Sequence, residues 1–257
     1  MLNFLVGAVI AAYSAAGFGA VNLADRHRAE QIVSIFENGT PFIQYNYAAK
    51  LEDGDKRGVT FGRAGFTSCQ DGAEVLEALQ QIDKHNALIV FLPEMRAAEA
   101  GRISCHDSVS NLLQNGFLKL FRRLGGSEEV RVAQDTVYSR RYYQPAVQLA
   151  KKLNLRSFWS FVLILDSYVQ HGEGDSGEGI EAILKNVNAA PAHNSPSERA
   201  WVLDFLNVRY KILLNGDPEW QASVGRVAVL RNLLNRYWGQ NPKTIEIRSS
   251  EYGNFDL

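Results

Sequence analysis

Apolar residues recur at intervals of three and four along most of the chain, which is the period of an amphipathic helix. The first such segment runs from Asp25, which can cap a helix, to Phe36, and Asn38-Gly39 follows as a stop signal. The segment 156–170 is apolar on nearly all sides, so we expect it at the centre of the fold. The same periodicity predicts further helices at 71–85, 88–100, 112–124, 128–143, 146–153, 180–187, 197–215 and 220–238.

Short extended segments interrupt this helical pattern near the front of the chain. Residues 44–47 and 59–61 combine aromatic and β-branched side chains and are bounded by glycines, as short strands are. A third strand-like run spans 244–247. A small antiparallel sheet among many helices indicates an α+β fold that is predominantly α-helical, and we expect two lobes with a cleft between them.

Composition and charge narrow the class of partner. The 257 residues are 46% hydrophobic and 21% charged, which is ordinary for a globular protein with a real core. The net charge of −1 gives no general attraction to nucleic acid or to acidic membranes, so we expect neither as a partner. Beyond the first 20 residues no apolar run reaches the roughly 18 residues that a membrane span needs.

Residues 1–20 are apolar and uncharged, with small residues near the end of the run. This pattern favours a secretory signal peptide, although no Lys or Arg precedes the apolar run, and the alternative is a buried N-terminal helix. We therefore expect a secreted, extracellular protein whose single two-lobed domain spans residues 21–257.

The chain has two cysteines, Cys69 and Cys105, and no C-x-x-C or Cys/His cluster that would indicate a metal site. In an exported protein the two can form one disulfide, whereas in a reducing compartment they would be buried thiols. The sequence leaves this choice open. We expect no cofactor and no metal.

Two acids stand out between residues 37 and 71. Glu37 lies at the C-terminal end of the first predicted helix, where unpaired carbonyl groups disfavour negative charge, so its carboxyl is expected to hold a proton. Asp55 lies in a glycine-bounded polar turn two residues before Arg57, a setting that favours the ionised form. One protonated acid and one carboxylate are what hydrolysis of a glycosidic bond requires. The chain has 28 Asp and Glu residues, so the two acids alone prove little.

The residues around these acids resemble the signature of the chitosanases of glycoside hydrolase family 46, in the lysozyme-like superfamily. The matching residues are Glu37-Asn38, Tyr47, the run from Asp55 through Arg57 and Gly58 to Thr60, Ala64-Gly65 and Asp71, with later matches at 137–138, 144–147, 166, 171–172 and 205–209. The resemblance implies a two-lobed lysozyme-like fold and an inverting, endo-acting hydrolase of β-1,4 bonds in chitosan. It further implies that Glu37 is the proton donor, that Asp55 is the general base, and that Thr60 helps to hold the attacking water.

Substrate contacts follow partly from charge and partly from the resemblance, which implies that Arg57 supports Asp55 and that Asp71 lines the cleft. Chitosan is a cationic polymer, and an acidic groove attracts it. Arg57 is expected to support Asp55, and Tyr45 and Tyr47 offer faces on which sugars can stack. The acids expected to bind glucosamine ammonium groups are Glu52, Asp53 and Asp71.

The family also has a buried ion-pair network of one Asp and two Arg residues. Asp166 lies on the most apolar predicted helix, where an unpaired carboxylate would cost several kcal/mol, so a structural salt bridge is expected there. The matching cations are Arg209 and Arg226, with Arg231 as a rival to Arg226. At Gln144 the chain departs from the family, whose members often have Asp before this proline, and we expect an effect on capping more than on chemistry.

The sequence also allows other roles for some of these residues and other functions for the protein. Asp53 is a rival base without the Asp-x-Arg spacing, Thr60 is otherwise only a strand residue, and Asp71 is otherwise only a helix cap or serves both roles. Competing functions are a lysozyme- or chitinase-like hydrolase of N-acetylated polymer and a non-catalytic sugar-binding protein, although a binder has no need to retain both acids. We expect a monomer.

Overall fold

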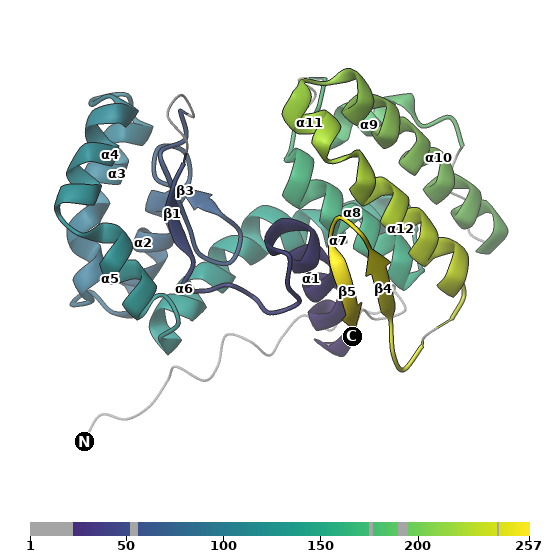
Figure 1. The fold of residues 1–257 in the computed structure, drawn as a ribbon, viewed down its shortest axis with the longest axis horizontal. Coiled ribbons are helices and arrows are strands. Elements are labelled where there is room, and N and C mark those ends of the chain that lie inside the picture. Colours follow the sequence, from purple (N-terminus) through teal and green to yellow (C-terminus); the bar gives the residue numbers. More distant parts are fainter. Residues whose placement is uncertain (1–22, 52–55, 175–176, 190–194, 241) are drawn as a thin grey trace.

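The structure, a computed structural model, describes residues 23–51, 56–174, 177–189, 195–240 and 242–257. The expected signal peptide at 1–20 therefore lies outside the described residues. Two lobes are connected by a long helical segment (Figure 1). The fold is mostly helical with small antiparallel sheets, as the sequence predicted. No helix in the described part of the chain has the length and hydropathy needed to cross a membrane.

The sheet lobe, on the left in Figure 1, follows the first helix in the sequence. It contains β1 (Ala48–Lys50), β2 (Val59–Phe61), β3 (Phe66–Thr67), α2 (Gly72–Ile82), the 3₁₀ turn η1 (Ala87–Phe91), α3 (Leu92–Glu99), α4 (Cys105–Gln114) and α5 (Phe117–Leu124). The strands form one antiparallel sheet in the order β1, β2, β3, with Thr60 of β2 paired to Ala49 on one side and to Thr67 on the other.

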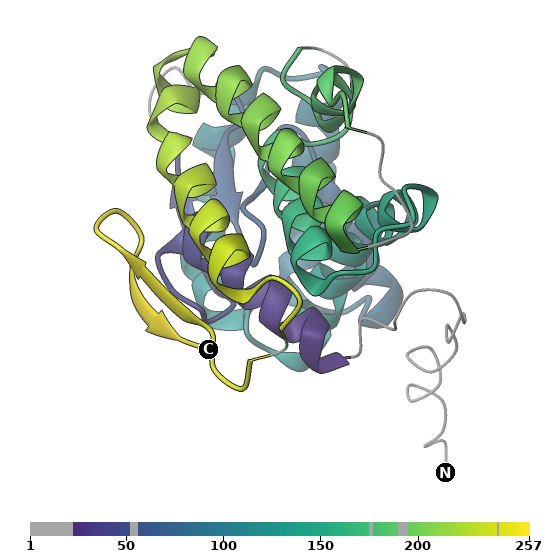
Figure 2. The same ribbon diagram turned by 90° about the vertical axis from the view of Figure 1, so that its right-hand side faces the viewer.

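The helical lobe combines the first helix with the C-terminal half of the chain. It contains α1 (Leu23–Asn38), α7 (Gln144–Lys152), α8 (Phe158–His171), α9 (Ile180–Asn186), α10 (Ser195–Asn215), α11 (Pro218–Ala222), α12 (Val224–Tyr237), β4 (Glu246–Ser249) and β5 (Gly253–Asp256). Helix α8 is buried along most of its length and packs against α1 and α7, so the expectation of a central helix is confirmed. Figure 2 shows the C-terminal hairpin beside α12 and α1, where Tyr252 packs edge-on against Phe36.

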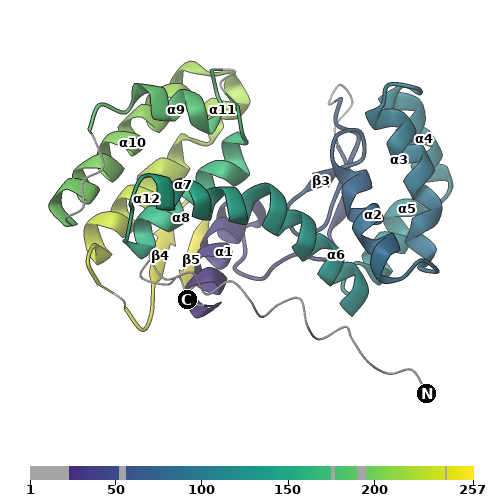
Figure 3. The same ribbon diagram turned by 180° about the vertical axis from the view of Figure 1, so that it is seen from behind.

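Two stretches of the described chain connect the lobes. Residues 39–47 lead from α1 to β1, and α6 (Glu128–Tyr138) with the π turn η2 (Ser139–Tyr143) leads back to α7 (Figure 3). Pro145 lies in the first turn of α7, directly after η2, because proline lacks the N–H that an interior helical position would need.

The structure corrects several predicted boundaries. The strand expected at 44–47 begins only at Ala48, and the strand at 244–247 is part of the β4–β5 hairpin. The helix expected at 112–124 is broken at Gly116, whose φ of +76° suits glycine best, and the helix expected at 220–238 is broken at Ser223. Helix α1 begins at Leu23, so Asp25 lies in its first turn and is not its cap.

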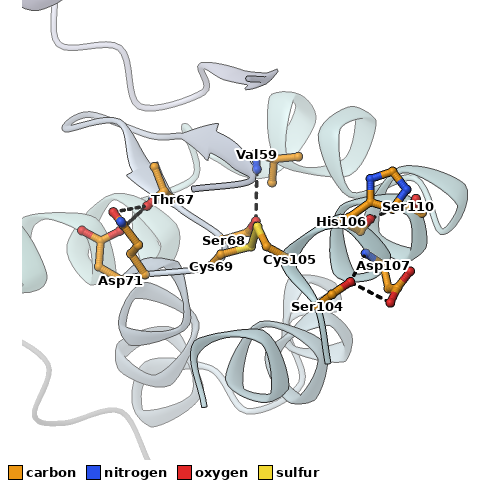
Figure 4. The surroundings of a disulfide bond; sticks show 11 residues. Val59, Thr67, Ser68, Cys69, Asp71, Ser104, Cys105, His106, Asp107 and Ser110 are labelled. Atoms are coloured by element: carbon orange, nitrogen blue, oxygen red, sulfur yellow. Dashed lines mark hydrogen bonds between the residues drawn. A yellow bond between two sulfur atoms is a disulfide. The ribbon is translucent and has the colours of Figure 1, made fainter. Parts of the chain in front are cut away.

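The two cysteines form a disulfide, which resolves the choice that the sequence left open (Figure 4). It joins the turn after β3 to the first residue of α4, Cys105. Gly58 packs against it with φ +94°, and a Cβ atom there would lie 2.8 Å from Sγ of Cys69. The disulfide therefore joins the sheet to α4 and packs against Gly58, next to the segment that carries Arg57.

Candidate active site

A cleft of about 770 Å³ lies between the lobes. Residues of α1, α8 and α12 line it from the helical lobe, and residues of the β1–β3 sheet and of the turns around it line it from the sheet lobe. Residues that the sequence singled out contribute to the lining, namely Glu37, Tyr47, Arg57, Thr60, Asp71 and Arg226.

Glu37 lies in the last turn of α1, as expected, and its side chain is 36% exposed to the cleft. Its Oε1 atom lies 2.5 Å from Nη1 of Arg226, which comes from α12. The ion pair joins residues 189 positions apart in the sequence and fixes the carboxylate at the cleft wall.

Arg226 also binds Asp166, which is fully buried in α8. Nη2 and Nε of Arg226 lie 2.6 and 3.0 Å from Oδ1 of Asp166, and Nη1 of Arg209 lies 2.7 Å from its Oδ2. Burial alone would raise the pKa of Asp166, but the Arg226 and Arg209 guanidinium groups hold it below its ordinary value. The rival cation, Arg231, instead bonds the exposed Asn207. Arg226 is therefore the second arginine that binds Asp166, as the sequence favoured.

Arg209 also contacts the last two residues of α8, Gln170 and His171. Arg209 donates to Oε1 of Gln170, which lines the cleft, and its Nε donates to Nε2 of His171 at 3.1 Å. Nδ1 of His171 lies 2.7 Å from the carbonyl oxygen of Glu178, so the ring is a donor on that side and an acceptor on the other. Burial and the Arg209 charge lower the pKa of His171 to about 3. His171 is therefore a neutral helix-end residue that orients Arg209.

The expected base follows β1 and precedes β2 in the sequence. Asp55, together with Glu52 and Asp53, falls outside the described residues. Its flanking residues Leu51 and Gly58 are joined by a hydrogen bond of 3.2 Å. Thr60, on the central strand, is 9% exposed and lines the cleft, so it is more than an internal strand residue.

Asp71 is the N-cap residue of α2, as expected, and its carbonyl oxygen accepts from the backbone N–H of Glu74 at 3.2 Å, but its side chain makes no capping hydrogen bond. Its Oδ1 instead accepts from the backbone N–H of Thr67 at 2.7 Å and from the Thr67 hydroxyl at 3.3 Å (Figure 4). Burial raises the pKa of Asp71, partly offset by these two bonds and by the Arg141 charge. The acid is thus held at the cleft wall and is easier to protonate than an exposed aspartate.

The two tyrosines expected as sugar platforms differ. Tyr47 is 43% exposed and lines the cleft. Tyr45 does not line it: the Tyr45 hydroxyl donates to Asp135 at 2.8 Å, and its ring contacts the guanidinium groups of Arg63 and Arg131. The stacking role expected for Tyr45 is therefore wrong.

The structure adds lining residues that the sequence did not single out. Among them are Gln70 after β3, Tyr142 in η2, Gln170 at the end of α8, Ser223 before α12, and Arg63 in the turn between β2 and β3. Burial, followed by the Asp71 charge, raises the pKa of Tyr142 above its ordinary value. Pro145 was the only local signal in the sequence for the irregular turn η2, which carries Tyr142, since a proline inside a long helical pattern marks such a turn. Among the described residues, no group of His, Cys, Asp and Glu side chains is arranged to hold a metal.

Comparisons with known proteins agree with this geometry. The model of glycosyl hydrolase family 46 matches residues 31–238. A chitosanase from Bacillus subtilis strain 168 is 40% identical over 247 residues, which is 91% of this chain and 86% of the relative. The solved structure of a mutant chitosanase from Bacillus subtilis MY002 in complex with six glucosamine units has a TM-score of 0.80 and 37% identity, covering 93% of this chain and 100% of that one. A chitosanase from Gynuella sunshinyii in complex with chitotetraose has a TM-score of 0.78 and 33% identity, with 93% and 99% coverage.

Proposed function

Since the chain belongs to glycosyl hydrolase family 46, we propose that it hydrolyses β-1,4 bonds between glucosamine units within chitosan chains. The observation that carries this proposal is the position of Glu37, held at the wall of an interlobe cleft by Arg226 and facing a lobe that presents Thr60 and Asp71. The solved relatives with bound glucosamine oligomers support the same class of substrate.

Asp71 is the substrate contact that the geometry supports best. Both hydrogen bonds from Thr67 go to Oδ1, so we assign Oδ2 to the ammonium group of a glucosamine unit in the cleft. A charged hydrogen bond of this kind favours glucosamine over its N-acetylated form, which carries no charge. Tyr47 offers an exposed ring in the same cleft. Glu52 and Asp53, which lie outside the described residues, remain proposed contacts.

In the proposed reaction Glu37 donates a proton to the glycosidic oxygen as the bond to the anomeric carbon breaks. Arg226 holds Oε1, so we assign the proton transfer to Oε2. Asp55 removes a proton from a water that attacks the anomeric carbon from the opposite face, while the Thr60 hydroxyl holds that water and Arg57 supports Asp55. Attack from the opposite face inverts the anomeric configuration, which needs carboxyl groups about 6.5–9.5 Å apart.

The test is the release of reducing ends from highly deacetylated chitosan by wild type, Glu37→Gln and Asp55→Asn. Both variants preserve side-chain shape and remove the proton-transfer function, so the rate should fall by at least about a hundredfold. Near-wild-type rates would refute the assignment. Asp256→Asn is the matched control, because it makes the same change at an exposed acid that does not line the cleft.

The alternative functions are separated by substrate choice. A lysozyme- or chitinase-like enzyme would act faster on heavily acetylated polymer than on deacetylated polymer. A sugar-binding protein would bind chitosan without releasing reducing ends. Either result would contradict the proposal.

We also propose that residues 1–20 form a cleaved signal peptide and that the protein works outside the cell as a monomer. The Cys69–Cys105 disulfide supports export, because disulfides persist mainly in oxidising compartments. N-terminal sequencing of protein from the culture medium tests the cleavage, and light scattering after size-exclusion chromatography tests the monomer. An intact N-terminus on cell-retained protein would contradict export.

A further inference from the structure

A buried cluster around Arg63 lies where the two lobes meet. Arg63 belongs to the tight turn between β2 and β3, and its side chain is only 3% exposed. Its Nη2 lies 2.8 Å from Oε2 of Glu30, which belongs to α1 in the helical lobe. Its Nη1 donates to Asp135 of α6, the helix that connects the lobes. One side chain of the sheet lobe thus binds two carboxylates that lie outside that lobe.

The surroundings hold this side chain in one position. The guanidinium group lies 3.9 Å from the ring centre of Tyr138, in a cation–π contact. The backbone N–H of Arg63 donates to Oε1 of Gln134, whose amide nitrogen in turn donates to the carbonyl oxygens of Tyr45 and Gly125. Glu30 receives a second bond, from Nε of Arg26 at 2.8 Å. The turn therefore cannot shift against α1 without breaking the bond to Glu30, or against α6 without breaking the bonds to Gln134 and Asp135.

The cluster is close in sequence to both sides of the reaction site. Glu30 precedes Glu37 by seven residues on the same helix, which is about two turns. Arg63 follows Thr60 by three residues across a tight turn. The pair thus connects the helix of the proposed proton donor to the strand of the proposed water-holding threonine.

We infer that the Arg63–Glu30 ion pair fixes the separation of the two sides of the cleft, and that Arg63 is a positioning residue for the hydrolysis. This inference rests on the proposed function. Both connections between the lobes also bind this turn: the Tyr47 carbonyl oxygen accepts from the backbone N–H of Gly62, and Gln134 and Asp135 of α6 bind Arg63. The bond from Arg63 to Glu30 differs from these, because it reaches the helix of the proposed proton donor directly. An inverting reaction depends on the carboxyl separation, and a displacement of about 1 Å costs on the order of a hundredfold in rate.

The kinetic test compares Arg63→Met, Glu30→Gln and the double variant. Each single change removes the interlobe bond, so kcat should fall about ten- to a hundredfold while KM changes by less than about threefold. The Arg63–Glu30 bond is already lost in each single variant. The double variant should therefore be no slower than the slower single variant. Arg63→Lys keeps the charge but loses the two-pronged geometry, so it should restore only part of kcat.

Arg96→Met is the matched control. Arg96 also binds two carboxylates, Glu77 and Glu99, but all three lie inside the sheet lobe on α2 and α3. Its loss should leave kcat unchanged. All assays run well below the lowest unfolding temperature of the set, and if Arg63→Met does not fold, Glu30→Gln carries the test alone.

A second measurement does not depend on catalysis. Spin labels at Val90→Cys and Leu214→Cys report the distance between exposed positions on the sheet lobe and the helical lobe. The distance distribution should broaden in Arg63→Met and in Glu30→Gln but not in Arg96→Met. An unchanged distribution together with an unchanged kcat would overturn the inference. A broadened distribution in a protein that does not cleave chitosan would refute the proposed function and leave the interlobe link standing.

Discussion

Removal of the Asp166 charge should be the most damaging single change in the helical lobe. Asp166 is fully buried, and it is the carboxylate shared by Arg209, also fully buried, and Arg226, of which 4% is exposed. In Asp166→Asn the two guanidinium groups lose the carboxylate that they share. Loss of one partner from a buried ion pair costs about 3–5 kcal/mol. At about 2–4 °C per kcal/mol for a domain of this size, the unfolding temperature should fall by roughly 6–20 °C.

The assay is urea denaturation at neutral pH, followed by tryptophan fluorescence. Asp256→Asn is the control, because Asp256 forms an exposed pair with Arg248 in which the two side chains are 59% and 47% exposed. An exposed pair of this kind contributes at most about 1 kcal/mol. If Asp166→Asn cost no more than Asp256→Asn, the idea that Asp166 anchors Arg226, and through it Glu37, would be refuted.

Three further predictions concern the sheet lobe. Reduction of the Cys69–Cys105 disulfide should lower the free energy of unfolding by about 2–5 kcal/mol, measured by urea denaturation with and without reductant; no change would contradict its bracing role. Gly58→Ala should cost more than about 2 kcal/mol through strain and contact with the disulfide, whereas Gly101→Ala, also at positive φ but in open space, should cost about 1 kcal/mol; equal costs would refute the packing argument. Because burial raises the pKa of Asp71, the ammonium contact should be lost as pH falls through that raised pKa, so KM for chitosan should rise at a higher pH than an exposed aspartate would allow. Asp71→Asn should raise KM and remove this pH dependence, and a wild-type profile in that variant would exclude the contact.

The helices were the most predictable part of the fold, because apolar periodicity reports directly which face of a helix is buried. The break at Gly116 was missed because apolar residues continue on both sides of it. The strand at 44–47 was misplaced because Tyr45 has strand-like character in the sequence, while in the fold its ring and hydroxyl are held by Arg63, Arg131 and Asp135.

The candidate site could be predicted only in part, for a physical reason. Glu37 and Arg226 are 189 residues apart, and no local pattern joins them, so the network was predicted from the family resemblance. The family resemblance did not include Glu30 or Arg63. Both look like surface charges in the sequence, and only the packing of α1, the β2–β3 turn and α6 shows that they are buried together.

Product analysis by time-resolved NMR on deacetylated chitosan tests the central claim most directly, since it reports bond cleavage and anomeric outcome together. Wild type should first release reducing ends in the α configuration, because attack by water on a β-linked unit inverts the anomeric carbon once. Glu37→Gln and Asp55→Asn should release almost none. Initial release of the β anomer, or undiminished product from either variant, would contradict the division of roles between Glu37 and Asp55.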